Sequence, residues 1–459
     1  MHTDDTITAI ASPPGSGAIA VIRVSGREAL QITDKVFFSK AKNKKLADQE
    51  PYSIHYGFIK AEDELIDEVL VSVFKAPRSF TGEDSVEISC HGSLFIQQKI
   101  INLLIKNGAR TASPGEFTQR AYLNGKMDLS QAEAVADLIA SESAAAHKIS
   151  LQQMRGGFTS DLKELRQQLL SFISLIELEL DFSEEDVEFA DRTQLQSLIR
   201  QIKERISELT SSFELGNVIK KGIPVAIVGE PNVGKSTLLN ALLNEDKAIV
   251  SDIAGTTRDA VEDVISLNGI LFRFIDTAGI RKTDDTIENL GIERTMQKIE
   301  KAEIVLYMMD ANDTDACSKV FEIKEKAKDK TLVLVINKID QGKADLEKQF
   351  ADCKELKIVH ISAKHRKNIK QLTDTLLDII HYSPDTKAGT IITNTRHFEL
   401  LQKAYEAAIR VDEGLTTGIT GDFLAQDIRE ILNHIGEITG EFTTDEVLGN
   451  IFANFCIGK

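Results

Sequence analysis

The segment Gly229-Glu230-Pro231-Asn232-Val233-Gly234-Lys235-Ser236 contains the residue types from which a phosphate-binding loop is built. It matches the pattern G-x-x-x-x-G-K-[ST] at every fixed position. Its glycines let backbone N-H groups curl around a polyanion, Lys235 can reach the outer phosphates, and Ser236 can place its hydroxyl on Mg²⁺. An apolar strand-like run precedes the segment and a helical pattern follows it, which is the context such a loop needs. We therefore predict that the chain binds a nucleoside triphosphate.

A second group of side chains, farther along the chain, favours guanine as the base. Asn337, Lys338 and Asp340 follow the apolar run 332–336, and Ser362-Ala363-Lys364 follows another short strand-like run. An Asp carboxylate can accept hydrogen bonds from both N1-H and N2-H of guanine, whereas adenine offers no such pair of donors. The spacing of these motifs resembles that of the small GTPase domain, so we expect the nucleotide to be GTP.

Two segments between these motifs contain residues that could sense the γ-phosphate. In the loop 251–259 a threonine can close over Mg²⁺ while the γ-phosphate is present, and we assign this role to Thr257. The next strand-like run leads to Asp276, expected to hold the Mg²⁺ shell, and to Gly279, whose N-H would sense the phosphate. The expected GTP-binding residues are therefore Asn232, Val233, Gly234, Lys235, Ser236, Thr237, Ser251, Asp252, Ile253, Ala254, Gly255, Thr256, Thr257, Asp276, Thr277, Ala278, Gly279, Asn337, Lys338, Asp340, Ser362, Ala363 and Lys364.

The residue after this last glycine lacks the side chain that many small GTPases use to orient the attacking water. Those proteins place a Gln there, but this chain has Ile280, and an aliphatic side chain cannot orient water. Arg281 and Glu288 follow in the next segment, and a carboxylate could act on the nucleophile through a bridging water. Positive charge for the transition state could come from an arginine or from a monovalent cation ligated by Asn232. The residues alone leave these alternatives open.

The composition indicates a multidomain globular chain. With 459 residues, of which 42% are hydrophobic, it is long enough to form more than one core. A net charge of -17 argues against a broad nucleic-acid-binding surface, so any RNA contact is expected to use a local patch or a partner. The chain has no long apolar run and no basic signal-peptide start, and we expect a cytoplasmic protein. Its four cysteines show no C-x-x-C spacing, which favours neither a zinc site nor a disulfide framework.

Residues 4–118 have the pattern of an α/β unit in which short strands carry polar side chains. Arg23 interrupts an apolar run, and its position alone favours solvent over a pocket. Glu87 lies on the polar face of an alternating strand, where a carboxylate could bind the amide and amine edge of a heterocycle. Cys90 and His91 are adjacent strand residues that point to opposite faces. We therefore interpret both as packing residues rather than as a catalytic pair.

Helical periodicity surrounds the nucleotide-binding segment. Ser130 with Glu133 fits a capping box, and the alanine-rich run that extends to Ala145 favours a helix. Apolar residues recur at helical spacing in 162–180 and 195–213, and again after Phe398. We therefore expect a multidomain α/β plus all-α fold, with a doubly wound, mostly parallel GTPase sheet inserted into a helical domain. The expected boundaries are 1–119 for the N-terminal α/β domain, 120–215 and 385–459 for the two parts of the helical domain, and 216–384 for the GTPase domain.

Four motifs along the chain carry a family resemblance. They are the N-terminal S-P-P-G-S-G-A-I-A-V-I-R-V-S-G, the central P-G-E-F-T-Q-R-A-Y-L-N-G-K-M-D-L-S-Q-A-E-A, the loop G-T-T-R-D and the terminal F-C-I-G-K. Together they closely resemble the MnmE (TrmE) family of tRNA-modification GTPases, and the resemblance runs the whole length of the chain. One departure is Ser93, where the family often has a second glycine after His91-Gly92.

This resemblance implies a homodimer formed through N-terminal domains that bind a tetrahydrofolate derivative, either 5-formyl or 5,10-methylene. It also implies work with the FAD-dependent partner MnmG on tRNA, adding a carboxymethylaminomethyl or aminomethyl group at C5 of the wobble uridine. GTP hydrolysis would be stimulated by potassium and would drive dimerisation of the GTPase domains. The alternative is a regulatory or ribosome-assembly GTPase that uses its N-terminal domain only for dimerisation.

The resemblance also assigns roles to individual residues. It implies folate contacts at Arg23, Glu87, Lys126 and Lys459. It implies potassium ligands at Asn232, Thr256 and the carbonyl groups of Ser251 and Ile253, and magnesium ligands at Ser236 and Thr257. Glu288 matches the carboxylate that orients water, and Cys456 matches a cysteine that the modification needs. With Lys235 of the phosphate-binding loop, the expected catalytic residues are Lys235, Glu288 and Cys456.

Overall fold

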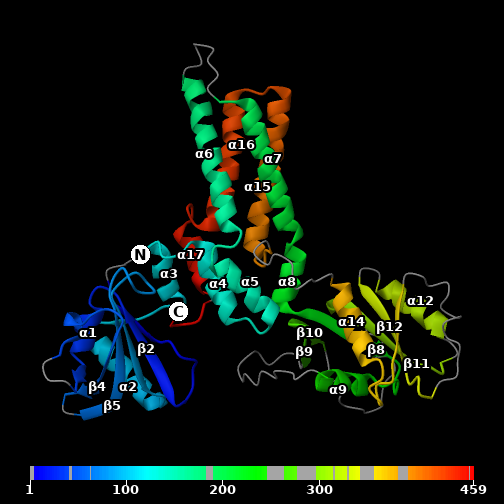
Figure 1. Ribbon diagram of the computed structural model, residues 1–459, viewed down its shortest axis with the longest axis horizontal. Coiled ribbons are helices and arrows are strands. Elements are labelled where there is room, and N and C mark those ends of the chain that lie inside the picture. Colours follow the sequence, from blue (N-terminus) through cyan, green and yellow to red (C-terminus); the bar gives the residue numbers. More distant parts are fainter. Residues whose placement is uncertain are drawn as a thin grey trace. The chain divides into compact units, whose positions relative to one another are not determined.

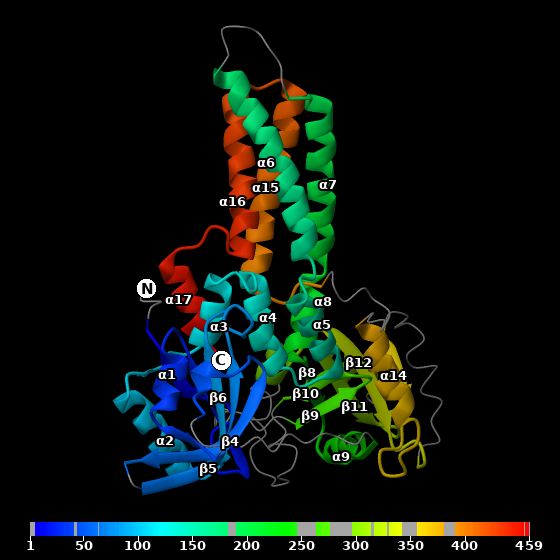
Figure 2. The same ribbon diagram turned by 60° about the vertical axis from the view of Figure 1, so that its left-hand side comes forward.

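The chain forms two compact units, each discontinuous in sequence. The computed structural model describes residues 5–40, 44–62, 64–181, 190–245, 263–275, 296–313, 316–327, 330–341, 356–380, 391–453 and 455–458. One unit comprises Met1–Ile139, Gln153–Lys203 and Leu400–Lys459, and the other comprises Ala140–Gln152 and Glu204–Glu399. Figures 1 and 2 label their elements. The domain boundaries expected from the sequence remain a prediction.

The first unit begins with a seven-stranded sheet in the order β3-β4-β5-β6-β2-β1-β7. Its strands are β1 (Ile7–Ile10), β2 (Ile19–Ser25), β3 (Phe37–Ser39), β4 (Ser53–Ala61), β5 (Glu64–Phe74), β6 (Ser85–His91) and β7 (Arg110–Thr111). The helices α1 (Ala29–Asp34) and α2 (Leu94–Lys106) pack on one face together with the short helix η1 (Leu46–Asp48). The core on that face includes Ile22, Val71, Ile88 and Leu104, all fully buried.

The other face of this sheet exposes apolar side chains. On β4, Ile54 is 67% exposed and Tyr56 is 40% exposed, although Ile59 on the same strand is fully buried. Leu70, opposite Tyr56 on β5, is 48% exposed. Successive strand residues point to opposite faces, so these exposed residues belong to the face that α1 and α2 do not cover.

Helices make up the rest of the first unit. They are α3 (Glu116–Leu123), α4 (Leu129–Ile139), α6 (Thr159–Asp181), most of α7 (Arg192–Ser211), most of α15 (Thr395–Thr417), α16 (Gly421–Thr439) and α17 (Asp445–Ala453). The long helices α6, α7, α15 and α16 run side by side (Figures 1 and 2). Near the C-terminus, Leu448, Phe452 and Phe455 pack with Leu129 of α4 in a small core.

The start of α4 differs from the sequence prediction. Asp128 caps the helix, because its Oδ1 accepts the Gln131 N-H over 2.9 Å and the Gln131 side chain accepts the Asp128 N-H over 2.9 Å. The capping box is therefore Asp128 with Gln131, and the predicted pairing of Ser130 with Glu133 is wrong. The alanine-rich run is also divided, since α4 ends at Ile139 and α5 (Ala144–Met154) begins after a break in which the Ser143 hydroxyl accepts an N-H of the new helix.

The second unit contains a six-stranded sheet in the order β13-β12-β11-β8-β10-β9. Its strands are β8 (Ile223–Gly229), β9 (Asp263–Leu267), β10 (Ile270–Phe274), β11 (Ile304–Asp310), β12 (Thr331–Asn337) and β13 (Lys357–His360), and all pairings are parallel except that of β9 with β10. The helices α9 (Lys235–Glu245) and α14 (Ile369–Ile379) pack on one face, and α12 (Ala316–Lys326) packs on the other.

Helices from outside the nucleotide-binding segment complete this second core. α5 places Ala145, Ala146 and Ile149 in the same apolar cluster as residues of β8, β9 and β10, and α8 (Phe213–Lys221) adds Ile219. The Ala145 N-H donates to Gly269 O in the β9–β10 turn over 3.1 Å. The core therefore depends on a helix that precedes the phosphate-binding loop by many residues. None of the helices in the described part of the chain is long and apolar enough to cross a membrane.

Candidate functional site

The phosphate-binding loop connects β8 to α9 at the carboxyl edge of the six-stranded sheet. Gly234 has a φ of +101°, and a Cβ built on it would lie 2.4 Å from Asn337 Nδ2, so both backbone and space require glycine. Asn232 also has a positive φ, of 63°, which asparagine tolerates better than most residues. Because α9 begins at Lys235, its first N-H groups have no acceptor within the helix and can donate to a phosphate. The loop therefore fits the phosphates of a nucleotide.

Lys235 is folded back onto this loop. Its Nζ donates to Gly229 O over 2.8 Å and to Glu230 O over 2.7 Å. Burial lowers the pKa of Lys235, and the nearby positive charge of Lys298 lowers it further. Phosphate groups in the loop would oppose both effects, so the environment of Lys235 favours an anionic ligand.

Asn337 connects the phosphate-binding loop to the segment 362–364. Its Nδ2 donates to Val233 O over 2.7 Å, and its Oδ1 accepts the Ala363 N-H over 2.9 Å. Only 3% of Asn337 is exposed. β12 ends at Asn337 beside the carboxyl end of β11, so the sheet brings together segments that are far apart in the sequence.

Asp340, the predicted reader of guanine, is held by a serine. Ser362 Oγ donates to Asp340 Oδ1 over 2.5 Å, and His365 Nε2 lies 3.5 Å from Asp340 Oδ2. The hydrogen bond from Ser362 lowers the pKa of Asp340 below its ordinary value. The carboxylate is therefore ionised at neutral pH, as it must be to accept hydrogen bonds from the guanine N1-H and N2-H.

The remaining predicted residues of this site lie outside the described part of the chain. They are Ser251, Asp252, Ile253, Ala254, Gly255, Thr256, Thr257, Asp276, Thr277, Ala278, Gly279 and Glu288. Of the predicted potassium ligands only Asn232 is described, and of the predicted magnesium ligands only Ser236, in the first turn of α9. The fit of either ion therefore remains a prediction.

A second polar site lies on the N-terminal sheet. Arg23 of β2 is directly opposite Glu87 of β6, and its Nη2 and Nε donate to Glu87 Oε1 over 2.8 and 3.0 Å. The guanidinium also lies 5.3 Å from the ring centre of Phe80 and 5.5 Å from that of Phe117. The Arg23 side chain is only 19% exposed, so the expectation that it lies in solvent is wrong. A facing carboxylate and two aromatic rings hold it in place.

The C-terminal tail packs beside this second site. The Gly115 N-H donates to Cys456 O over 3.3 Å, and Gly115 immediately precedes α3, which carries Phe117. A Cβ built on Gly458, whose φ is +94°, would lie 2.2 Å from Ile10 O. Ile10 belongs to β1, which pairs with β2. The fold thus brings the exposed Cys456 to the same end of the unit as Arg23.

The other predicted folate contacts are placed only in part. Lys126 Nζ donates to Pro77 O over 2.9 Å, three residues before Phe80, whose ring contacts Arg23. Lys459 lies outside the described residues. The described residues of this site thus offer the cations of Arg23 and Lys126, the Glu87 carboxylate and the Phe80 ring, which is 39% exposed. These groups suit a polar heterocycle with an acidic tail.

A buried ion network that supports α3 was not predicted from the sequence. Arg120, whose side chain is 3% exposed, donates to Asp5 O over 2.8 Å and to Glu116 Oε1 over 3.0 Å, and lies 3.2 Å from Glu83 Oε1. Burial lowers the pKa of Arg120, but the charge of Glu83 and the hydrogen bonds that Arg120 donates to Asp5 and Glu116 raise it overall. Asp5 and Glu83 are far from Arg120 in the sequence, so no local pattern could reveal these two contacts. Glu116 lies four residues before Arg120 on the same helix.

The pair Cys90–His91 differs in part from its predicted packing role. Cys90 lies in the sheet core, and burial raises the pKa of its thiol to about 11. The His91 side chain is instead 69% exposed, and its Nδ1 lies 2.7 Å from Asp67 Oδ1. The packing interpretation therefore holds for Cys90 and is wrong for His91.

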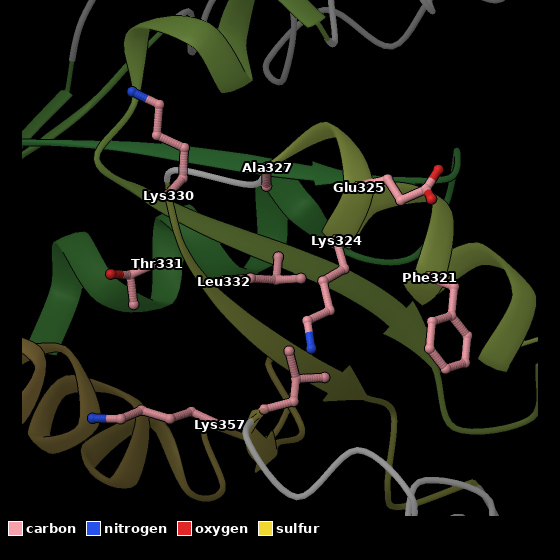
Figure 3. Close-up of a pocket in the computed structure, with 9 residues that line it drawn as sticks. Phe321, Lys324, Glu325, Ala327, Lys330, Thr331, Leu332 and Lys357 are labelled. Atoms are coloured by element: carbon pink, nitrogen blue, oxygen red, sulfur yellow. The ribbon is translucent and has the colours of Figure 1, made fainter.

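A pocket of about 470 Å³ opens beside α12 and the first residues of β12 and β13 (Figure 3). Phe321 and Leu332 contribute apolar surface, and Lys324, Lys330 and Lys357 lie around them. The nucleotide motifs follow the carboxyl ends of β8 and β12, whereas this pocket lies at the opposite ends of its strands. It is therefore not the nucleotide site.

Comparisons with known proteins agree with the motifs. Residues 6–126 match the family described as GTP-binding protein TrmE N-terminus, and residues 129–456 match the MnmE helical domain family. The chain is 57% identical over 465 residues to tRNA modification GTPase MnmE of Bacteroides fragilis, covering 99% of each chain. It is 54% identical over 467 residues to the protein of that name from Flavobacterium johnsoniae, covering 100% of each. A solved structure of Era from Aquifex aeolicus, 31% identical, matches 40% of this chain and 66% of its own with a TM-score of 0.28.

Proposed function

Because this chain belongs to the MnmE (TrmE) family of tRNA modification GTPases, we propose that it acts on C5 of the wobble uridine of certain tRNAs. It adds an aminomethyl-type group with a one-carbon unit from a tetrahydrofolate, together with the FAD protein MnmG. The observation that carries this proposal is the Arg23–Glu87 pair, held between two aromatic rings beside the C-terminal tail with Cys456.

The geometry of the second site supports folate as its ligand. One oxygen of Glu87 accepts both hydrogen bonds from Arg23, which leaves Oε2 to accept from an amide N-H or amine of a pterin. Phe80 offers an exposed ring on which a flat heterocycle can stack, and Lys126 can pair with a carboxylate of the glutamate tail. When bound, the folate supplies the one-carbon unit. Arg23 orients the Glu87 carboxylate for this contact.

At the nucleotide site, the chain's own residues bind, select and orient. Lys235 and the N-H groups at the start of α9 bind the phosphates, and Ser236 offers a hydroxyl to Mg²⁺. Asp340, held by Ser362, selects guanine. Glu288 orients the attacking water, and Asn232 takes part in a potassium site that supplies positive charge in place of an arginine.

The exposed face of the N-terminal sheet supports a homodimer. Ile54, Tyr56 and Leu70 are neighbouring exposed positions with apolar surface on β4 and β5, and clustered apolar surface of this kind can mark a protein–protein contact. A second copy of the chain would cover this face.

Calorimetric titration of the full chain with 5-formyl-tetrahydrofolate tests the proposed function. The unaltered chain should bind, and Glu87→Ala should bind at least about tenfold more weakly, because the loss removes a charge-assisted contact to the pterin. His91→Ala, an exposed change on the same strand, is the matched control and should bind normally. If the unaltered chain does not bind folate while Arg23 and Glu87 are intact, the modification proposal fails and the regulatory alternative is favoured.

A further inference from the structure

Lys338 occupies an unusual position at the start of the predicted guanine-binding loop. It follows the last residue of β12 with a φ of +64°, in the left-handed region that lysine adopts rarely. Asp340 lies two residues later, and its carboxylate must meet two adjacent donors of the guanine edge. A small change at Lys338 therefore changes the direction in which Asp340 is presented.

Asp310, the last residue of β11, holds the side chain of Lys338. Its Oδ2 lies 2.8 Å from Lys338 Nζ, and the two side chains are 27% and 33% exposed. Its Oδ1 accepts the Asn312 N-H over 3.0 Å, so the carboxylate is fixed from both sides. Asp310 and Asn337 are directly opposite each other in the sheet, which fixes the backbone beneath the pair.

The guanine-binding loop is thus tied on two sides. On one side Ser362 Oγ donates to Asp340, and the Ile339 N-H donates to Ile361 O over 3.3 Å. On the other side the Asp310–Lys338 ion pair restrains the residue that carries the left-handed turn. Burial raises the pKa of Asp310, but the hydrogen bonds from Lys338 and Asn312 lower it overall. Asp310 therefore keeps its charge at neutral pH.

We propose that Asp310 is a positioning residue for guanine selection: through Lys338 it fixes the left-handed turn that presents Asp340 to the base. Asp310 itself does not contact the nucleotide. This inference rests on GTP being the bound nucleotide. It predicts that loss of the Asp310 carboxylate affects recognition of the guanine 2-amino group more than it affects binding of the phosphates.

The test compares GDP with IDP, which lacks the 2-amino group that Asp340 recognises. Dissociation constants for both are measured by titration calorimetry on the full chain and on Asp310→Asn. The unaltered chain should prefer GDP, and Asp310→Asn should reduce this preference about three- to tenfold, because a partly exposed ion pair is lost. IDP affinity should change little. Asp374→Asn, which removes an exposed carboxylate on α14 in the same unit, should leave both affinities unchanged.

A combined variant separates positioning from general damage. If Asp310 acts through Lys338, the variant that carries both Asp310→Asn and Lys338→Met should lose no more preference than Lys338→Met alone. Additive losses, or equal weakening of GDP and IDP binding in Asp310→Asn, would overturn the inference. If the unaltered chain binds neither nucleotide, GTP binding itself is refuted, and the inference falls with it.

Discussion

Replacing Asn337 by alanine should destabilise the nucleotide-binding unit even in the absence of nucleotide. The change removes the hydrogen bonds to Val233 O and from the Ala363 N-H, and it leaves both groups without their partner in a buried environment. Val233 is 6% exposed and Ala363 is 2% exposed, so water cannot readily replace the lost partner. Each unsatisfied buried group costs about 1–3 kcal/mol, which gives a loss of roughly 2–6 kcal/mol for the pair.

Scanning calorimetry of the full chain without nucleotide measures this loss. For a unit of this size a change of 1 kcal/mol moves Tm by about 2–4 °C, so the transition of the second unit should fall by roughly 5–20 °C. Asn337→Asp keeps the acceptor for Ala363 N-H but places a carboxylate oxygen next to Val233 O, and it should also destabilise the unit. Asp374→Asn, at an exposed position of α14 in the same unit, is the control.

A Tm shift for Asn337→Ala no larger than that of Asp374→Asn would refute this reasoning. It would mean that the two loops are held together by packing alone. GTP affinity is measured separately on the folded variant, because loss of the link should also loosen the phosphate-binding loop.

Four further predictions concern the rest of the molecule. Replacing potassium by sodium should slow GTP hydrolysis strongly, and equal rates in the two salts would favour an arginine as the source of positive charge. Glu288→Ala should lower the turnover of GTP while leaving GTP affinity nearly unchanged, and normal turnover would contradict the role of Glu288. Arg120→Met should cost no more than about 3–5 kcal/mol at pH 7, because Glu83 loses the charge of Arg120, whereas Asp5 and Glu116 keep their ion pairs with Arg110. Burial raises the pKa of Glu116, but hydrogen bonds from Arg110 and Arg120 hold it below its ordinary value of 4.5. The stability that ionised Glu116 contributes is therefore complete above pH 4.5 and is lost as the pH falls further. Denaturant titrations measure the free energy of unfolding of the unaltered chain and of Arg120→Met. The difference between them should be smaller at pH 3 than at pH 7, and an equal difference at both pH values would contradict the role of ionised Glu116. Iodoacetamide at pH 8 should modify the exposed Cys456 but not Cys90, which is 3% exposed and has a pKa of about 11; peptide mass spectrometry that finds equal modification would exclude the buried position.

The sequence predicted correctly those features that depend only on the residue types and spacing within one short segment. The segment 229–236 requires glycines, a lysine and a serine at fixed spacing, and the structure places it between a strand and a helix. The run 332–336 was likewise expected to be a buried strand, and it lies within β12.

The sequence failed where a partner from a distant segment decides the outcome. The Arg23 side chain was expected to be exposed to solvent, because no residue near it in the chain indicates that Glu87 and two aromatic rings surround it. His91 looked suited to packing because the carboxylate of Asp67 comes from another strand. At α4 the cap lies two residues before the predicted Ser130, because Asp128 and Gln131 exchange the capping hydrogen bonds.

The position of α5 in the second core has a consequence for the order in which the protein can fold. Ala145, Ala146 and Ile149 leave the ribosome well before the β9–β10 hairpin against which they pack. Chains generally fold as they are synthesised, domain by domain from the N-terminus. During that interval the apolar residues of α5 have none of their final partners from β9 and β10, so the nascent chain exposes them until the hairpin has been made. Transiently exposed apolar surface promotes aggregation, and we expect the nascent chain to be prone to it during this delay.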